Sequence, residues 1–235
     1  MTTVWPLPAR IRGVFLQPRA TFDVLAAAPR SADVLAIALV AAFAATALAL
    51  ETATGELALL DQLERTASAF GKPMDDSQYK TLQEISGHGT AYAFVTALVA
   101  GPVLALGVST ALVAALRPPA GVTVRYRHVL AITSHASVIL AVRQVLAAPF
   151  IYARETLASP LTLSMFFTLL DEGSPLARFA GMIDLFVIWW IVVLASGVSV
   201  LYRRPVVRTA VAFAGIYVVL AALAALAVAV TGGFA

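Results

Sequence analysis

The fold class of this chain is decided by the stretch VLAIALVAAFAATALAL at residues 34–50, which contains no charged side chain. An α-helix rises ~1.5 Å per residue, so about 20 apolar residues cross the ~30 Å hydrocarbon core of a bilayer. Residues 34–50 reach the lower end of the usual span length, and Ser31 or Asp33 can cap the helix at its start. The stretch therefore predicts a transmembrane helix.

Four further stretches have the same character. Sixty per cent of the residues are hydrophobic, only 12% are charged, and the mean hydropathy is +0.89. A soluble globular domain has about twice that charged fraction. We therefore expect an all-α integral membrane protein, with a bundle of five transmembrane helices in one domain at residues 34–235. The other four predicted spans are residues 91–116, 129–151, 179–201 and 206–230.

Basic residues alternate between the segments that connect these spans. Ten of the sixteen lie before the first span, between the second and third, or between the fourth and fifth, where the acids are Asp23 and Asp33. The other two connections hold most of the acids. Because basic loops stay in the cytoplasm, we expect a cytoplasmic N-terminus and an external C-terminus. The many arginine and alanine residues suit a bacterial plasma (inner) membrane.

Residues 1–33 are predicted to be a cytoplasmic segment. Between Trp5 and Pro29 they combine large apolar residues with arginine, which is typical of an amphipathic helix at the membrane interface. Pro18 suits a fresh helix start within it. Three arginines can meet anionic headgroups at about 1 kcal/mol each. The apolar residues are Ile11, Val14, Phe15, Phe22 and Leu25, and the three arginines are Arg10, Arg12 and Arg19.

Both external connections contain further helical patterns. Leu57, Leu60, Leu63 and Phe70 keep helical spacing, and Asp76-Ser77 can cap a short helix that ends at Ile85. The apolar run at residues 163–170 is too short to span and predicts an interfacial or re-entrant helix.

The motifs of several enzyme classes are absent. The chain contains no phosphate-binding Gly-rich loop, no His-Glu-x-x-His and no Gly-x-Ser-x-Gly. It also lacks cysteine, which excludes disulfides, thiolate metal sites and cysteine nucleophiles. We therefore expect a non-enzymatic protein without a cofactor or metal. Nucleic acid is not an expected partner, because the net charge of +3 reflects arginines beside the membrane.

Arg143 and Asp184 are predicted to form an ion pair within the membrane. Arg143 lies ~21 Å along the third span from the cytoplasmic side, which is ~9 Å below the outer boundary of a ~30 Å hydrocarbon core. Asp184 lies ~8 Å into the fourth span, measured from that outer boundary. Their depths agree, and an unpaired charge at the bilayer centre costs about 2.5–3.5 kcal/mol. In the alternative, Arg143 extends to the outer headgroups and Asp184 meets interfacial water.

His128 and His135 give the third span a polar face. They are seven residues apart, on one helix face but ~10.5 Å apart along the axis, which is too far for a shared metal. A proton relay along this face is one interpretation. The other is that His135 is a buried histidine hydrogen-bonded to Ser134, Ser137 or a neighbouring helix.

The second span carries small residues at every fourth position. Such a row lets helices approach closely in lipid and predicts a packing face. Alternatively, the row arises by chance, because the chain is so rich in alanine. Pro102 should kink this span beside the row. The members of the row are Ala93, Ala97, Gly101, Ala105 and Ser109.

Three stretches resemble the Yip1 family of five-span membrane proteins in its bacterial form: FLQPRATF at residues 15–22, the start of the third span at 127–142, and IDLFVIW at 183–189 followed by LASG at 194–197. The third span departs from the family pattern, because Ser137 is followed by Val138 where members often carry proline. The resemblance implies the five-helix fold and a role in membrane organisation or transport. It does not extend to the small-GTPase binding of eukaryotic relatives, whose long N-terminal region we expect this chain to lack.

Two functions remain open. In the first, the chain organises membranes or serves as an accessory subunit of a transport or envelope system, with membrane lipid and other membrane proteins, or further copies of itself, as partners. In the second, it is a conduit for a lipid or small solute, with a cavity between the second, third and fourth spans. Cysteine labelling along these spans would reveal such a cavity.

Overall fold

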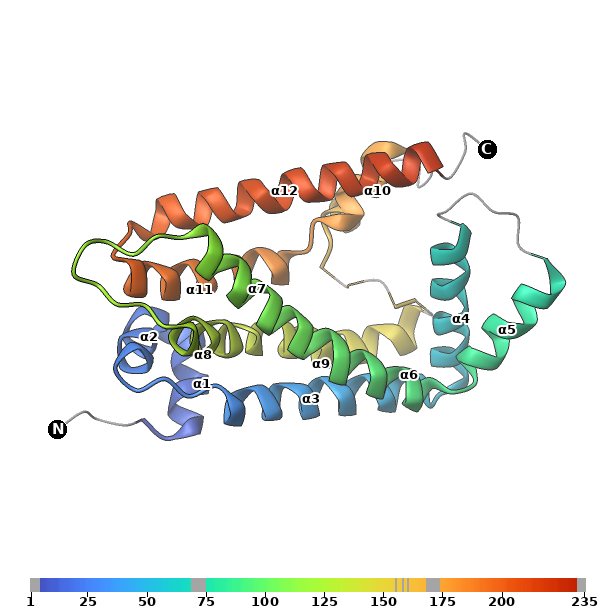
Figure 1. Ribbon diagram of the computed structural model, residues 1–235. Helices are drawn as coiled ribbons and strands as arrows, with labels where there is room; N and C mark the ends of the chain where they lie inside the picture. Colours follow the sequence, from blue (N-terminus) through green and yellow to red (C-terminus); the bar gives the residue numbers. More distant parts are fainter. Residues whose placement is uncertain are drawn as a thin grey trace. The chain divides into compact units, whose positions relative to one another are not determined.

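The computed structural model describes residues 5–68, 75–154, 156–157, 159, 161–167 and 174–231, which are mostly helical (Figure 1). Five helical stretches in this part of the chain are long and apolar enough to cross a membrane. The all-α fold with five transmembrane helices is therefore confirmed. The five stretches are Ala32–Leu50, Gly89–Ala115, Tyr126–Ala153, Leu185–Tyr202 and Val206–Val228.

The chain forms two compact units. Unit 1 consists of residues 1–41, 97–142 and 186–215, and unit 2 of residues 42–96, 143–185 and 216–235. Unit 1 contains the N-terminal segment and both arginine-rich connections, whereas unit 2 contains the two acidic connections. Each unit thus contains connections of one charge type, as expected for five spans that cross a membrane in alternate directions.

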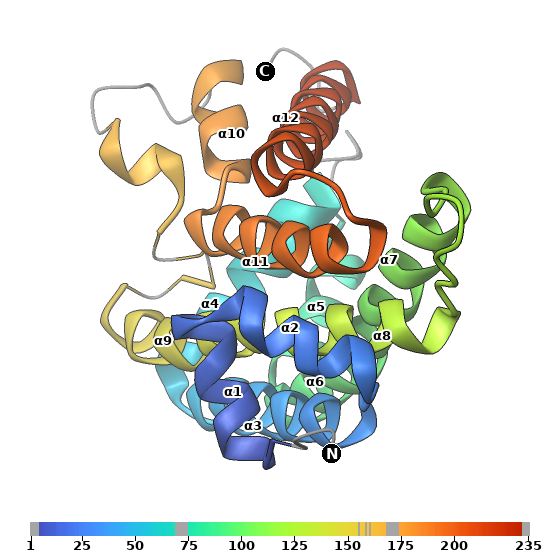
Figure 2. The same cartoon turned by 90° about the vertical axis from the view of Figure 1, so that its left-hand side faces the viewer.

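Unit 1 is built around the N-terminal helices and the third and fourth spans. Helices α1 and α2 are separated at Gln17, and Pro18 begins α2 as expected. Both helices contact α8 (Figure 2). The elements with residues in unit 1 are α1 (Leu7–Leu16), α2 (Pro18–Ala27), α3 (Ala32–Leu50), η1 (Thr96–Ala100), α7 (Gly101–Ala115), α8 (Tyr126–Ala136), α9 (Val138–Arg154), α11 (Leu185–Tyr202) and α12 (Val206–Thr231).

The apolar side chains of α1 and α2 lie in the protein core of unit 1. Val14 and Phe22 are fully buried and Leu25 is 1% exposed. They belong to one cluster with Ile132 of α8 and Val198 of α11. The sequence interpretation assigned these side chains to the membrane interface, but they pack on protein because α8 and α11 offer a complementary apolar face.

Gly197 permits the close approach of three helices in this core. A Cβ atom at this position would overlap Ile132 Cγ2 and lie 3.2 Å from Phe22 Cδ2. Only glycine lets α11 lie this close to both α2 and α8.

Unit 2 contains the helices of the external connections. Helices α4, α5 and α6 contact one another, and Leu50, Leu59 and Ala93 form one of two small apolar cores. Helix α5 begins with Asp75 as its N-cap, one residue before the predicted cap. The elements with residues in unit 2 are α3, α4 (Ala53–Ser68), α5 (Asp76–Ser86), α6 (Gly89–Val95), η1, α9, η2 (Leu163–Phe166), α10 (Pro175–Met182), α11 and α12.

Parts of the two predicted loop helices lie outside the described residues, namely Phe70 and residues 168–170. The described part of the second pattern is a single 3₁₀ turn at η2.

Two of the spans depart from the regular helices expected. The second contains a π-helical turn, η1, directly before Gly101-Pro102. Such a turn accommodates the hydrogen bond that proline removes, so the predicted distortion takes this form. The fourth span begins at Leu185 and not near Phe179, because the chain is extended at Ile183 and Asp184. There, the backbone pairs with residues 161–163 through Leu163 N to Ile183 O, 2.8 Å, and Leu185 N to Leu161 O, 3.0 Å.

Candidate functional site

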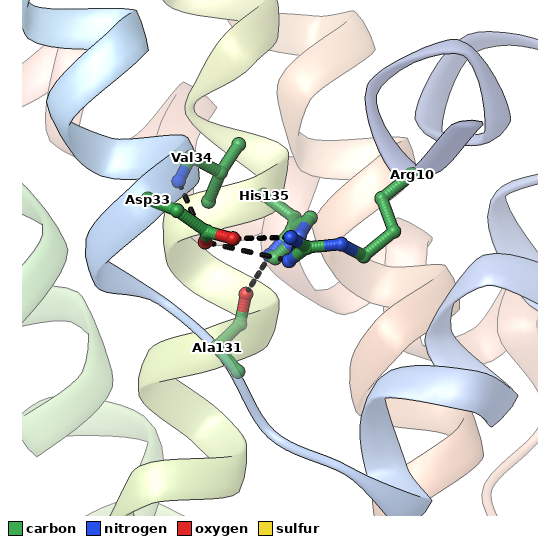
Figure 3. Close-up of polar contacts among 5 residues, drawn as sticks. All are labelled: Arg10, Asp33, Val34, Ala131 and His135. Carbon is green, nitrogen blue, oxygen red and sulfur yellow. Dashed lines mark hydrogen bonds and ion pairs between the residues drawn. The ribbon is translucent and has the colours of Figure 1, made fainter. Parts of the chain in front are cut away.

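A buried polar cluster in unit 1 joins three helices (Figure 3). Arg10 from α1 forms an ion pair with Asp33 at the start of α3. Its Nη1 atom lies 3.1 Å from Nε2 of His135 in α8 and 3.4 Å from Asp33 Oδ1. Arg10 is 3% exposed and His135 is fully buried, whereas the Asp33 side chain is 38% exposed. We call these three residues the Arg10 cluster.

The hydrogen bonds determine the protonation of His135. Its Nδ1 atom lies 2.7 Å from the carbonyl oxygen of Ala131, which can only accept, so Nδ1 carries the hydrogen. The Arg10 guanidinium can only donate, so Nε2 must be the acceptor. His135 is therefore neutral in this arrangement, with its acceptor turned toward the arginine.

The Arg10 cluster fastens the N-terminal helices to the first and third spans. Asp33 neutralises the guanidinium and also accepts a hydrogen bond from Val34 N at 2.8 Å. Removing one partner from a buried ion pair typically costs about 3–5 kcal/mol, because the other charge stays buried without compensation.

The sequence interpretation was wrong about Arg10, which it placed among the lipid headgroups. Arg10 lies four residues before Val14, so the two share a helix face. Because Val14 is core, Arg10 is drawn inward too and needs a counter-charge. This shared face is the signal that could have identified Arg10, and Asp33 is the nearest acid at the start of a span.

The structure brings Arg143 and Asp184 together in unit 2. Arg143 Nε donates to Asp184 Oδ2 at 2.6 Å, with the two side chains 29% and 7% exposed. The Asp184 backbone N–H donates to the hydroxyl oxygen of Tyr217 at 3.0 Å, and that hydroxyl donates to the Met182 carbonyl at 2.6 Å. Tyr217, which sequence reasoning missed, thus links α12 to the break before α11.

His128 makes no hydrogen bond with His135. Its Nδ1 atom accepts a hydrogen bond from Arg125 N at 3.1 Å, which caps the start of α8. The two histidines lie near opposite ends of α8, so the relay interpretation gains no support from their contacts.

The row of small residues coincides with the less exposed face of the second span. Ala93, Ala105 and Ser109 are buried and Ala97 is half-buried. At Gly101, a Cβ atom would overlap Leu39 Cδ2 of the first span. The row therefore has the geometry of a packing face on either side of the π turn.

The chemistry available in the described part of the chain is limited. Within these residues no group of three or more His, Cys, Asp or Glu side chains is placed to hold a metal ion. Two clefts are lined by α1 with the residues before it, and by α5 with α6. Neither includes a residue of the third or fourth span.

Comparison with known families agrees with the fold. The family model described as the Yip1 domain matches residues 12–229, nearly the whole chain. The chain belongs to the Yip1 family. Searches of curated proteins and of solved structures give no match. In this Yip1 domain Asp33, His135, Arg143 and Asp184 lie within the matched residues, and Arg10 lies two residues before them.

Proposed function

We propose that this Yip1-family membrane protein is a non-enzymatic scaffold that organises a bacterial plasma membrane or serves as an accessory subunit of a transport or envelope system. The observation that supports it best is the Arg10 cluster. Its three ionisable side chains are engaged with one another and hold α1, α3 and α8 together. We therefore infer that the protein acts through the surfaces of its helices and not through a reactive side chain.

The low burial of the first, second and fifth spans supports a scaffold role. Only 22%, 17% and 11% of the first, second and fifth spans is buried, against 61% of the fourth. Valine and leucine side chains of α12 are exposed, including Val219 at 57% and Leu223 at 56%. Such surfaces are available to lipid and to other membrane proteins or a second copy.

The orientation follows the charges. Unit 1 contains ten arginines but only two acids, Asp23 and Asp33. With these arginines in the cytoplasm, the N-terminus lies inside and the C-terminus outside.

Site-specific photo-cross-linking in native membranes tests the scaffold role. A photoreactive amino acid at Val219 should give discrete adducts with a protein, while the matched position Ala221, 6% exposed on the same helix, should give none. Adducts with lipid alone at Val219, and at Val103 on α7, 62% exposed, would contradict the proposal.

One observation favours the conduit as a second candidate. In unit 1, the buried polar atoms Ser134 Oγ, Trp190 Nε1 and Ser199 Oγ have no hydrogen-bond partner among the described residues. Buried polar groups usually bind protein or ordered water, so these atoms suit a hydrated space between α8 and α11. Because the chain has no cysteine, single cysteines at Ser134 and Ser199 can be tested with a water-soluble thiol reagent. Labelling from the aqueous side supports the conduit, and protection excludes it.

A further inference from the structure

A cleft of about 610 Å³ lies along helix α1 and the residues that precede it. Its lining combines aromatic and aliphatic groups, including Trp5 and Leu16, with one charged side chain, Arg12. Its size falls within the ~300–1,000 Å³ typical of small-molecule sites.

Gly13 is a buried member of the cleft lining. A Cβ atom at Gly13 would lie 3.2 Å from the Trp5 ring and would overlap Thr21 Oγ1. The glycine therefore lets both the Trp5 ring and Thr21 of α2 approach α1 at the position that a side chain would fill. Trp5 stays half-buried, and tryptophan is enriched at membrane interfaces because one end of its ring is apolar and the other polar.

Arg12 and Leu16 are exposed residues of the cleft lining, one turn apart on α1. Leu16 is 64% exposed. Arg12 is exposed and makes no hydrogen bond or ion pair with the described residues, in contrast to Arg10, which is neutralised by Asp33. A free guanidinium beside an apolar cleft matches a ligand with an anionic head and an apolar tail. Arginine binds phosphate oxygens bidentately.

The exposed charge of unit 1 as a whole is also positive. Of the ten arginines in unit 1, nine are exposed, whereas Asp23 is its one exposed acid in the described part of the chain. This surface attracts anionic headgroups and disfavours cationic ones.

We propose that this cleft binds an anionic phospholipid, with the phosphate on Arg12 and the acyl chain against Leu16 and Trp5. The site goes beyond the scaffold role, since it holds whether or not a protein partner is found. It gives the N-terminal helices a lipid preference that a general surface charge would not give.

Trp5 provides the readout. In a W189F/W190F chain it is the sole remaining tryptophan. This chain is placed in phosphatidylcholine nanodiscs containing a small fraction of either brominated phosphatidylglycerol or brominated phosphatidylcholine, because bromine quenches nearby tryptophan fluorescence. We expect stronger quenching by the phosphatidylglycerol, corresponding to an enrichment of about fivefold, as for one basic side chain at an anionic surface.

Arg12→Gln should remove most of this difference, and Arg19→Gln is the matched control. Arg19 is also exposed but lies on α2, outside the cleft lining, so it should retain most of the preference. Equal quenching by both lipids in the parent would overturn the proposal. So would an equal loss in both variants, which would show diffuse surface charge. Both substitutions are at exposed positions, and unchanged circular dichroism confirms the fold.

Discussion

Arg10→Ala is expected to weaken the whole unit 1 core, although the residue lies outside the predicted spans. The substitution removes the ion pair with Asp33 and the hydrogen bond to His135 Nε2. It also leaves the His135 acceptor buried without its partner. Since Arg10 anchors α1, which carries Val14 into the core, α1 should loosen as a unit.

The magnitude follows from the burial of the partners. Removing one member of a buried pair costs about 3–5 kcal/mol. Asp33 is 38% exposed and can be solvated once it is alone, so we expect the lower end, about 3 kcal/mol. Asp33→Ala should cost more, because it leaves the Arg10 charge buried without compensation. The double variant should lose less than the sum of the two single losses.

Thermal unfolding of the purified protein in mild detergent measures these differences. Arg12→Ala is the matched control, two residues along the same helix but exposed, and it should stay within about 0.5 kcal/mol of the parent. If Arg10→Ala and Arg12→Ala unfold alike, or if the losses of Arg10→Ala and Asp33→Ala simply add, the Arg10 cluster does not hold the N-terminal helices.

Three further experiments test separate contacts. In a double-mutant cycle, Arg143→Ala and Asp184→Ala should each cost about 3 kcal/mol, with the charge-swapped pair recovering part of the loss; purely additive unfolding energies would argue against the pair. Gly101→Leu should cost about 1–3 kcal/mol of stability by overpacking against Leu39, and so lower the midpoint of thermal unfolding. Gly107→Leu should have little effect, because nothing lies within 4 Å of its Cβ position. Equal midpoints would refute the packing face. Arg203 directly follows α11 and has a φ of 49°, a backbone conformation that favours glycine. Arg203→Gly should therefore stabilise the protein by up to about 1 kcal/mol, and a lower unfolding temperature would contradict this.

The spans could be predicted from sequence because hydropathy and length decide them. Four of the five predicted spans begin and end within about three residues of the observed helices. The fourth was misplaced at its start, because Phe179 and its neighbours are apolar but belong to α10. The break at Ile183 and Asp184 depends on a backbone pairing with residues 161–163, distant in sequence, which no local pattern encodes.

The ionisable residues were harder to place. Arg143 and Asp184 could be matched by depth, since both lie in or beside spans with few other charges. Arg10 could not be placed by charge alone. An arginine before the first span is equally compatible with headgroups and with a buried partner. The two cases are separated by the helix face that Arg10 shares with Val14, once Val14 is known to pack in the core of unit 1.

The most direct test of the account is whether α1 packs on the transmembrane helices in a native membrane. The ring centroids of Phe15 and Trp189 of α11 lie 5.6 Å apart, and the chain has no cysteine of its own. With a short membrane-permeant bis-maleimide, the pair Phe15→Cys and Trp189→Cys should cross-link efficiently. Leu16→Cys with Trp189→Cys should not, since Leu16 lines the cleft on α1 and is 64% exposed. Equal cross-linking of the two pairs, or none in either, would mean that α1 lies free on the membrane surface.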